Sequence, residues 1–175
     1  MKKLFAVALL LCMLCTCAFA EEESTMTLSW SDIPEEVQNA GQFTQIAIPD
    51  YPVIVCWIPA NMDAVDVSMI EAEVAPVAAF QTADGAYTVS IYALQVTGVV
   101  EYLNGLAENG AELNNVNTNG IDACSFVQKG DVEVEGLIIP MSDNLVLSIA
   151  CTPVDGDEDW DQVKGVIFSS IQVAE

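Results

Sequence analysis

The sequence contains no histidine and no arginine, and its only lysines are Lys2, Lys3, Lys129 and Lys164. Without histidine, neither a Ser-His-Asp nor a Cys-His arrangement can form within this chain, and the His-Glu-x-x-His zinc motif is excluded. Without arginine, no guanidinium is available to bind a carboxylate or a phosphate through two parallel hydrogen bonds. The phosphate-binding sequences Gly-x-x-x-x-Gly-Lys and Gly-x-Gly-x-x-Gly are absent as well. These absences exclude most known catalytic sites, so we predict a protein that is not an enzyme.

The start of the chain has the parts of a secretory signal peptide. Lys2 and Lys3 are positively charged, residues 4–14 are apolar, and Ala18-Phe19-Ala20 supplies the small residues that precede a cleavage point. The apolar stretch is shorter than the ~20 residues that a membrane-spanning helix needs. We therefore expect cleavage after Ala20, secretion, and no membrane insertion of the mature protein. A retained anchor and lipidation of Cys17 are the alternatives, although the residues before Cys17 fit a lipobox poorly.

The expected mature protein is strongly acidic. It has 26 Asp and Glu against 2 Lys, which gives a net charge of 2 − 26 = −24. This charge repels phosphate backbones, so we predict no nucleic-acid partner and leave basic partners and cations open. The content of Val, Ile, Ala and Leu distinguishes the chain from a disordered acidic tail. We predict a signal peptide (1–20), an N-terminal segment (21–40) and a single α+β domain (41–175).

Three cysteines remain after the expected cleavage, at Cys56, Cys124 and Cys151. Each lies in an apolar run typical of a strand, and free cysteine is among the most buried residue types. We interpret all three as inert thiols in the core. Their odd number allows one internal disulfide at most, and a Cys124–Cys151 bridge between neighbouring strands is the alternative. A zinc site is disfavoured because the cysteines are widely spaced and no histidine completes a ligand set.

The hydrophobic pattern predicts strands, then a helix, then three more strands and a closing helix. Asp84-Gly85 indicates a tight hairpin turn, and a turn at residues 49–52 joins two early strands. The predicted strands are 25–30, 42–48, 53–58, 77–82, 86–95, 121–128, 132–140 and 145–151, and the predicted helices are 35–39, 98–109 and 158–171. Residues 61–74 receive no assignment. This order predicts an α+β fold in which an antiparallel sheet is covered by two helices.

The helix at 98–109 has a predicted cap and a predicted buried face. Thr97 is the expected N-cap residue. Val99, Leu103 and Leu106 recur at helical spacing, and Val100 widens this apolar stripe. We expect the stripe to pack on the sheet.

The order of elements resembles that of the PsbP-like fold. The resemblance covers roughly Gly41 to Val173 and includes the segment Ile46-Ala47-Ile48-Pro49 and the ending Val166-Ile167-Phe168-Ser169-Ser170-Ile171. The family includes a photosystem extrinsic subunit, a nuclear import factor and many small exported bacterial proteins. The resemblance implies a sandwich of sheet and helices with a binding or assembly role. It supplies no site residue.

The best metal-binding candidate is the acidic stretch between residues 155 and 161. Asp155, Asp157 and Asp159 match the first three ligand positions of an EF-hand calcium loop, and their carboxylates are the oxygen ligands that calcium prefers. The match then fails, because Trp160 stands where the loop needs glycine and Val166 where it needs glutamate. The alternative is an acidic loop before the closing helix, where carboxylates are favoured by the helix dipole. No other cofactor is predicted.

Three early aromatic residues, Trp30, Tyr51 and Trp57, are candidates either for the core or for an exposed patch that binds a glycan or a protein. Hydrolysis by a pair of carboxylates needs only Asp or Glu and remains a further alternative. We predict an exported, acidic, non-catalytic binding or accessory protein of the bacterial cell envelope or extracellular space. A calcium-dependent extracellular module that uses residues 155–161 is the second reading, and a carboxylate-dependent hydrolase is the third.

Overall fold

The largest unit of the protein is an eight-stranded sheet. The computed structural model describes residues 25–70, 72, 74–130, 133–156 and 158–174. The strands lie in the order β1-β7-β8-β9-β10-β6-β5-β4, and neighbours are antiparallel except for the parallel pair β1–β7. The bounds are β1 Met26–Leu28, β4 Met62–Ala64, β5 Ala78–Thr82, β6 Thr88–Gln95, β7 Glu112–Thr118, β8 Ile121–Gln128, β9 Val134–Ser142 and β10 Leu145–Thr152.

A second, three-stranded sheet packs on the large one. It has the order β11-β3-β2, with β2 at Gly41–Ile46, β3 at Ile54–Pro59 and β11 at Gln172–Val173. Both of its strand pairs are antiparallel, and β3 lies in the middle. The 3-10 turn η1 (Trp30–Asp32) and the short helix α2 (Glu35–Gln38) precede this sheet, and a second 3-10 turn, η2 (Val67–Met69), follows β4.

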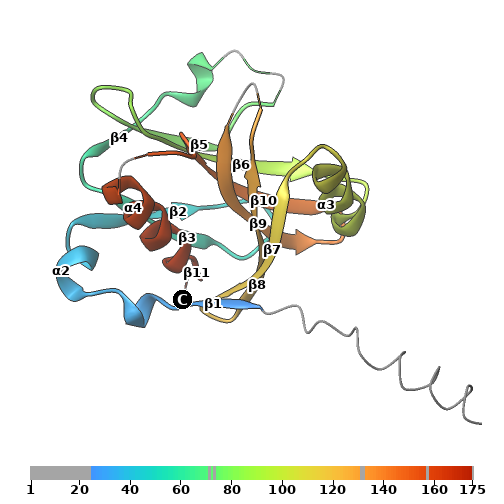
Figure 1. The fold of residues 1–175 in the computed structure, drawn as a ribbon, viewed down its shortest axis with the longest axis horizontal. Helices are drawn as coiled ribbons and strands as arrows, with labels where there is room; N and C mark the ends of the chain where they lie inside the picture. The colour runs from blue at the N-terminus through green and yellow to red at the C-terminus, as the bar shows by residue number, and fades with distance from the viewer. Residues whose placement is uncertain (1–24, 71, 73, 131–132, 157, 175) are drawn as a thin grey trace, which may run out of the picture.

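The two longer helices lie on opposite sides of the large sheet. Helix α3 (Val99–Glu108) covers part of one face, and α4 (Glu158–Ser169) lies on the other side together with the small sheet. Figure 1 shows this arrangement, with the large sheet between the two helices. The α+β class is therefore confirmed.

The core consists of two clusters, one on each face of the large sheet. Leu147 and Ile149 of β10 point into the larger cluster, which also contains Ile58 of β3 and Ile167 of α4. Residues of the opposite parity, such as Val146, belong to the smaller cluster beneath α3. Strand β10 is buried from Leu145 to Cys151, so its continuous apolar run reflects burial on both faces.

Most of the predicted elements are confirmed. The hairpin of β5 and β6 turns at Asp84-Gly85, where Gly85 has a φ of 73°. The turn between β2 and β3 contains Asp50 with a φ of 70°. Helix α2 lies within residues 35–39, and α3 and α4 occupy the predicted helical segments.

Five details of the prediction are wrong. The structure has two sheets rather than one, and β1 pairs in parallel with β7. Strands β7 and β11 were not predicted, and β4 lies in the stretch of residues 61–74 that received no assignment. Val100 lies on the outer face of α3 with 72% of its surface exposed, so it does not widen the buried stripe. Gly98 takes the N-cap position, while the Thr97 hydroxyl instead donates to the Glu101 carboxylate across 2.9 Å.

The predicted signal peptide lies outside the described residues. Residues 25–40 contact the rest of the protein through β1, η1 and α2. Among the residues described, no helix is both long enough and apolar enough to cross a membrane.

Candidate binding surfaces around the closing helix

Lys164 is the buried centre of a polar network on α4. Only 4% of its surface is exposed. Its ammonium group donates to the Glu135 carboxylate of β9 across 2.6 Å and to the Val154 carbonyl oxygen across 2.7 Å. It also forms an ion pair of 2.9 Å with Asp161, one helical turn earlier. The network therefore ties α4 to β9 and to the segment that follows β10.

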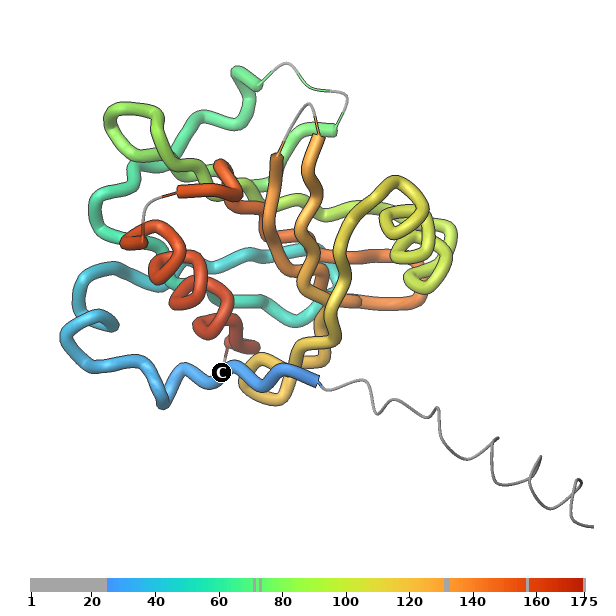
Figure 2. The backbone as a smooth tube through the Cα atoms, viewed as in Figure 1, coloured from blue at the N-terminus to red at the C-terminus, as the bar shows by residue number. Residues whose placement is uncertain are grey.

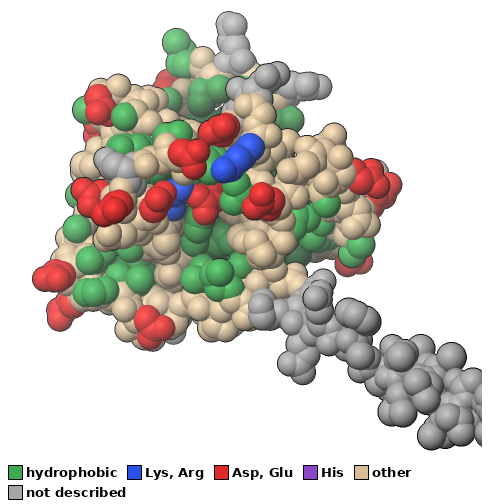
Figure 3. All heavy atoms as spheres, viewed as in Figure 1, with side chains coloured by type: hydrophobic (Ala, Val, Ile, Leu, Met, Phe, Trp, Pro, Cys, Tyr) green, Lys and Arg blue, Asp and Glu red, His purple; other side chains and the backbone are tan. Residues whose placement is uncertain are grey.

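The same network forms one side of an open groove of about 390 Å³. Its charged lining includes Lys129 and Lys164 together with the carboxylates of Glu112, Glu135, Asp155 and Asp161. In Figure 3 the blue lysine side chains lie among red carboxylates on one face of the molecule. Both basic residues of the expected mature chain thus line the same groove, where acids outnumber them.

Lys164 stays protonated in this environment. Burial by itself lowers its pKa, but the hydrogen bonds and charges of Glu135 and Asp161 outweigh burial and raise the pKa above its ordinary value of 10.5. A lysine that acts as a nucleophile or base near neutral pH needs a lowered pKa. The groove therefore contains a positive charge that is already balanced, and it lacks an activated amine at this position.

The structure describes two of the three carboxylates predicted to bind metal. Asp155 lines the groove beside Lys164. Asp159 lines a separate cavity near Pro59 and Tyr87. Asp157 lies outside the described residues. Within the described ranges no group of three or more acid or thiol side chains is arranged to hold a metal ion. The calcium site therefore stays a prediction.

A smaller cavity of about 220 Å³ lies at the start of α4. The rings of Tyr87 and Trp160 stack there with centroids 4.7 Å apart and an interplanar angle of 21°. The Trp160 indole N–H donates to the Pro153 carbonyl oxygen across 2.9 Å, which fixes the ring. Asn61 and Asp159 add polar atoms to the rim. The cavity combines aromatic and polar groups, but it is smaller than the ~300 Å³ at which most ligand pockets begin.

The predicted early aromatics divide between core and surface. Trp57 is buried, and its indole N–H donates to the Gln38 carbonyl oxygen across 3.0 Å. Trp30 packs beside it and meets Phe43 edge-on, with ring centroids 5.1 Å apart. Phe43 is 44% exposed and was not singled out from the sequence. Tyr51 is half-buried and shares a hydrogen bond of 3.2 Å with Ser142. Core packing of Trp57 is thus confirmed.

All three cysteines are buried and free. Cys56 and Cys151 belong to the larger core cluster, whereas Cys124 belongs to the cluster beneath α3. Strand β9 separates the strands of Cys124 and Cys151. The alternative Cys124–Cys151 bridge is therefore wrong, because the two side chains lie on opposite faces of the sheet. Burial raises the pKa of Cys56 to about 12, although its hydrogen bond with Ser170 acts in the opposite direction.

Comparisons with known proteins bear on the fold. No protein-family model matches the chain, and no curated protein matches it. Among solved structures, the solution structure of cyanobacterial PsbP (CyanoP) from Synechocystis sp. PCC 6803 matches at 15% identity with a TM-score of 0.46. The match covers 77% of this chain and 94% of that chain. The matched protein is a PsbP, the family whose fold the sequence resembles. The match says nothing of activity, ligand or partner.

Proposed function

We propose that the mature protein is an exported, non-catalytic binding or accessory domain of the bacterial cell envelope or extracellular space. One observation carries this proposal: the buried lysine Lys164 and the three buried cysteines are held in unreactive forms. Lys164 is bound to two carboxylates and a carbonyl group, and its pKa is raised. A raised pKa disfavours the free amine that nucleophilic catalysis needs.

The thiols support the same proposal. Burial raises the pKa of Cys56, Cys124 and Cys151, and the thiolate rather than the thiol is the reactive form. No histidine is present in the sequence to activate a serine, threonine or cysteine. What remains for function is surface recognition by an acidic domain, with a protein or a glycan as partner.

Chemical cross-linking in intact producing cells tests the proposal. We expect the protein expressed from its full-length sequence to form one adduct of fixed stoichiometry with an envelope or extracellular component. The purified protein from Glu21 to Glu175 should hydrolyse no glycoside, ester or peptide substrate. Turnover that disappears when one particular Asp or Glu is replaced by its amide would contradict the proposal and favour a carboxylate-dependent hydrolase.

A further inference from the structure

Strand β2 forms an unprotected edge of the small sheet. It pairs with β3 on one side only, from Gly41 opposite Pro59 to Ile46 opposite Ile54. Exposed sheet edges are usually blunted by lysine, proline or charged side chains, because unpaired peptide groups recruit further strands. Residues 41–46 include none of these.

The direction of each peptide group in β2 follows from the printed hydrogen bonds of its neighbour. The Ala174 N–H donates to the Val53 carbonyl across 2.8 Å, and the Trp57 N–H donates to the Ser170 hydroxyl across 2.8 Å. Odd-numbered residues of β3 therefore face β11, since successive peptide groups of a strand point to opposite sides. The even-numbered ones face β2, in agreement with the 3.0 Å bond from the Ala60 N–H to the Ala40 carbonyl.

The register between β2 and β3 then shows which peptide groups of β2 point away from β3. Because Ile58, Cys56 and Ile54 lie opposite Gln42, Thr44 and Ile46, these even-numbered residues of β2 face β3. The peptide groups of Gly41, Phe43 and Gln45 point away from β3. Within the part of the chain that the structure describes, those of Phe43 and Gln45 form no hydrogen bond.

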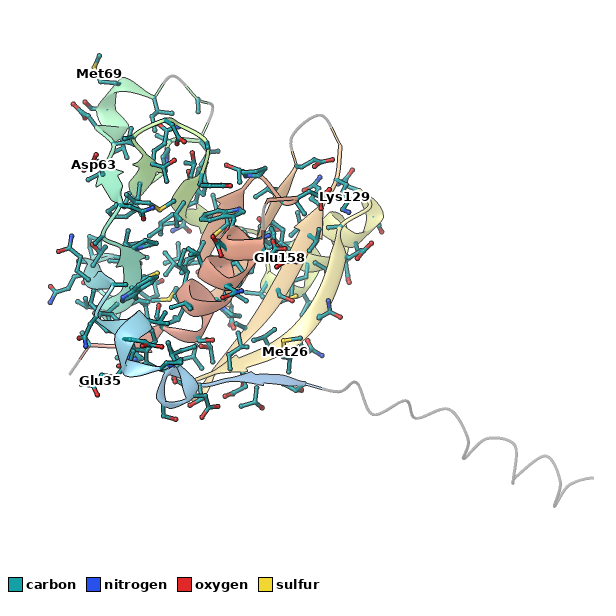
Figure 4. The ribbon with its side chains drawn as sticks, turned by 60° about the vertical axis from the view of Figure 1, so that its left-hand side comes forward. Met26, Glu35, Asp63, Met69, Lys129 and Glu158 are labelled. Carbon is teal, nitrogen blue, oxygen red and sulfur yellow. The ribbon has the colours of Figure 1, made fainter. Side chains whose placement is uncertain are left out.

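The surroundings of this edge are apolar in the middle and acidic at both ends. No charged residue lies between Glu36 and Asp50 in the sequence. Phe43 offers an exposed ring beside Trp30 at the centre of the strand. Glu35 and Glu36 are exposed on α2 directly before β2, and Asp50 is exposed in the turn after it. Figure 4 shows Glu35 on α2, which leads into β2.

We propose that β2 is a docking edge for an extended segment of a partner protein, which adds a strand to the small sheet and carries basic side chains at its ends. This inference rests on the proposed binding function and names its partner class. Peptide groups of Phe43 and Gln45 supply the backbone bonds of strand addition, and the ring of Phe43 meets an apolar side chain of the partner. The acids at both ends select a basic segment in either strand direction.

Charge decides against a second copy of this chain as the occupant. Two copies paired through β2 would bring Glu35, Glu36 and Asp50 of each protomer together, and each protomer carries a net charge of −24 after the expected cleavage. No lysine lies near enough in the sequence to balance them, since Lys129 and Lys164 line the groove at β9 and α4. Like charges placed opposite each other disfavour association.

A pair of synthetic peptides tests the edge directly. The first is a blocked peptide of alternating threonine and valine with lysine at each end, and the second is its twin with glutamate at each end. We expect the lysine-ended peptide to bind the purified protein at least about tenfold more tightly at low salt, with the difference shrinking as salt is raised. Bound peptide should slow hydrogen exchange at the amides of Phe43 and Gln45.

Two variants of one residue separate backbone pairing from other contacts. Gln45→Pro removes an N–H that points outward, which an edge strand tolerates because the bonds to β3 stay intact. Gln45→Thr keeps the N–H and serves as the matched control. We expect the proline variant to melt near the wild-type temperature and to bind the lysine-ended peptide at least about tenfold more weakly, with the threonine variant unchanged.

Three results would overturn the inference. They are equal binding of the two peptides, no binding at about millimolar concentration, and protection from hydrogen exchange that is confined to a strand other than β2. The exchange measurement uses the unaltered protein, so it decides the matter even if Gln45→Pro fails to fold. The cellular cross-link distinguishes this inference from the proposed function. If the adduct persists unchanged in Gln45→Pro, the proposal that β2 is the docking edge is wrong, but the proposed binding function is not contradicted.

Discussion

The side-chain amide of Asn119 donates a hydrogen bond of 2.7 Å to the carbonyl oxygen of Ser169, which joins the turn after β7 to the end of α4. A second bond of 2.9 Å reaches the Ile171 carbonyl, and the Asn119 side-chain oxygen accepts the Trp30 N–H across 2.8 Å. Asn119 also has a φ of 49°, a left-handed conformation that asparagine tolerates. Figure 2 shows the three segments meeting beside the C-terminus. One side chain therefore fastens the N-terminal segment, the sheet and the closing helix together.

Replacing Asn119 by aspartate should destabilise the protein. Asn119→Asp removes both donors and places a carboxylate against the carbonyl oxygens of Ser169 and Ile171, so we expect a loss of about 2–3 kcal/mol in the free energy of unfolding. Urea unfolding followed by tryptophan fluorescence measures it. Asn104→Asp is the charge-matched control on the exposed side of α3, and it should change stability by no more than about 0.5 kcal/mol. Equal losses in the two variants would assign the effect to added charge.

The fold was largely predictable because local patterns agree with the tertiary structure. The Asp84-Gly85 turn and the alternation along β6 identify a hairpin without knowledge of its neighbours. Strand β7 was missed because its sequence from Glu112 to Thr118 contains three asparagines, which are rare in strands. Its pairing with β1 and β8 overrides that propensity. The following Asn119-Gly120 was the overlooked signal, since this dipeptide is typical of hairpin turns.

The candidate surfaces were less predictable than the fold. The spacing of Asp155, Asp157 and Asp159 is visible in the sequence, but the contact between Lys164 and Glu135 joins residues from different elements. It depends on how α4 packs on β9, which local patterns do not specify. The edge at β2 likewise follows from the order of strands in the small sheet. An absence of charge between Glu36 and Asp50 is the one sequence signal that points to it.

The Lys164 network should depend more on Glu135 than on Asp161. The Glu135 side chain is 28% exposed and that of Asp161 is 61% exposed, so solvent screens the second ion pair more strongly. We expect Glu135→Gln to cost about 1–3 kcal/mol and Asp161→Asn less than about 1 kcal/mol. Urea unfolding at neutral pH measures both. Adding Lys164→Met to Glu135→Gln should cost less than the sum of the two single changes, and strict additivity would contradict the pairing.

Two glycines should respond to alanine in opposite directions. A Cβ on Gly136 in β9 would collide with the Ile149 carbonyl oxygen and lie 2.8 Å from the Phe126 ring. We expect Gly136→Ala to cost about 3 kcal/mol through overpacking. Gly165 lies inside α4 with open space around its Cβ position, so Gly165→Ala should add about 0.5–1 kcal/mol. Thermal unfolding of both variants checks the pair, and destabilisation by Gly165→Ala would contradict the packing of α4.

The acidic stretch at the start of α4 should make the melting temperature depend on divalent cations. Asp155 shares its groove with two lysines, and Asp159 lines a different cavity. We expect calcium and magnesium at equal millimolar concentrations to raise the melting temperature above that in EDTA by similar amounts, because both screen the negative surface. A rise specific to calcium, lost in Asp155→Asn and Asp159→Asn, would instead establish the calcium site that the spacing of the aspartates suggests.

The buried thiols predict a loss of stability in alkali. Burial raises the pKa of Cys56 to about 12 despite its bond to Ser170, and burial likewise raises that of Cys151. In the unfolded chain a thiol ionises near its ordinary value of 9.0, so above that pH the unfolded state holds fewer protons than the folded one. The free energy of unfolding should therefore fall as the pH rises through 9, with a slope that approaches about 1.4 kcal/mol per pH unit for each thiol well above pH 9.

Variants identify the groups responsible for this slope. Urea unfolding between pH 7 and pH 11 should show that the free energy of unfolding falls less steeply with pH in Cys56→Ala, because one titrating proton is removed. This change of slope is independent of any stability that the variant loses at neutral pH. Val89 is as buried as Cys56 but has no titratable group, so Val89→Ala is the control. It should lower stability at every pH and leave the slope unaltered. Lys164 acts in the same direction at higher pH, because its raised pKa contributes stability that is lost above about 10.5. Tyr102, whose pKa is raised from 10.0 by burial, also acts in this direction, so the comparison of Cys56→Ala with the wild type, rather than the pH range, identifies the thiol. A slope between pH 9 and pH 10 that Cys56→Ala leaves intact would show that Cys56 is not the titrating group.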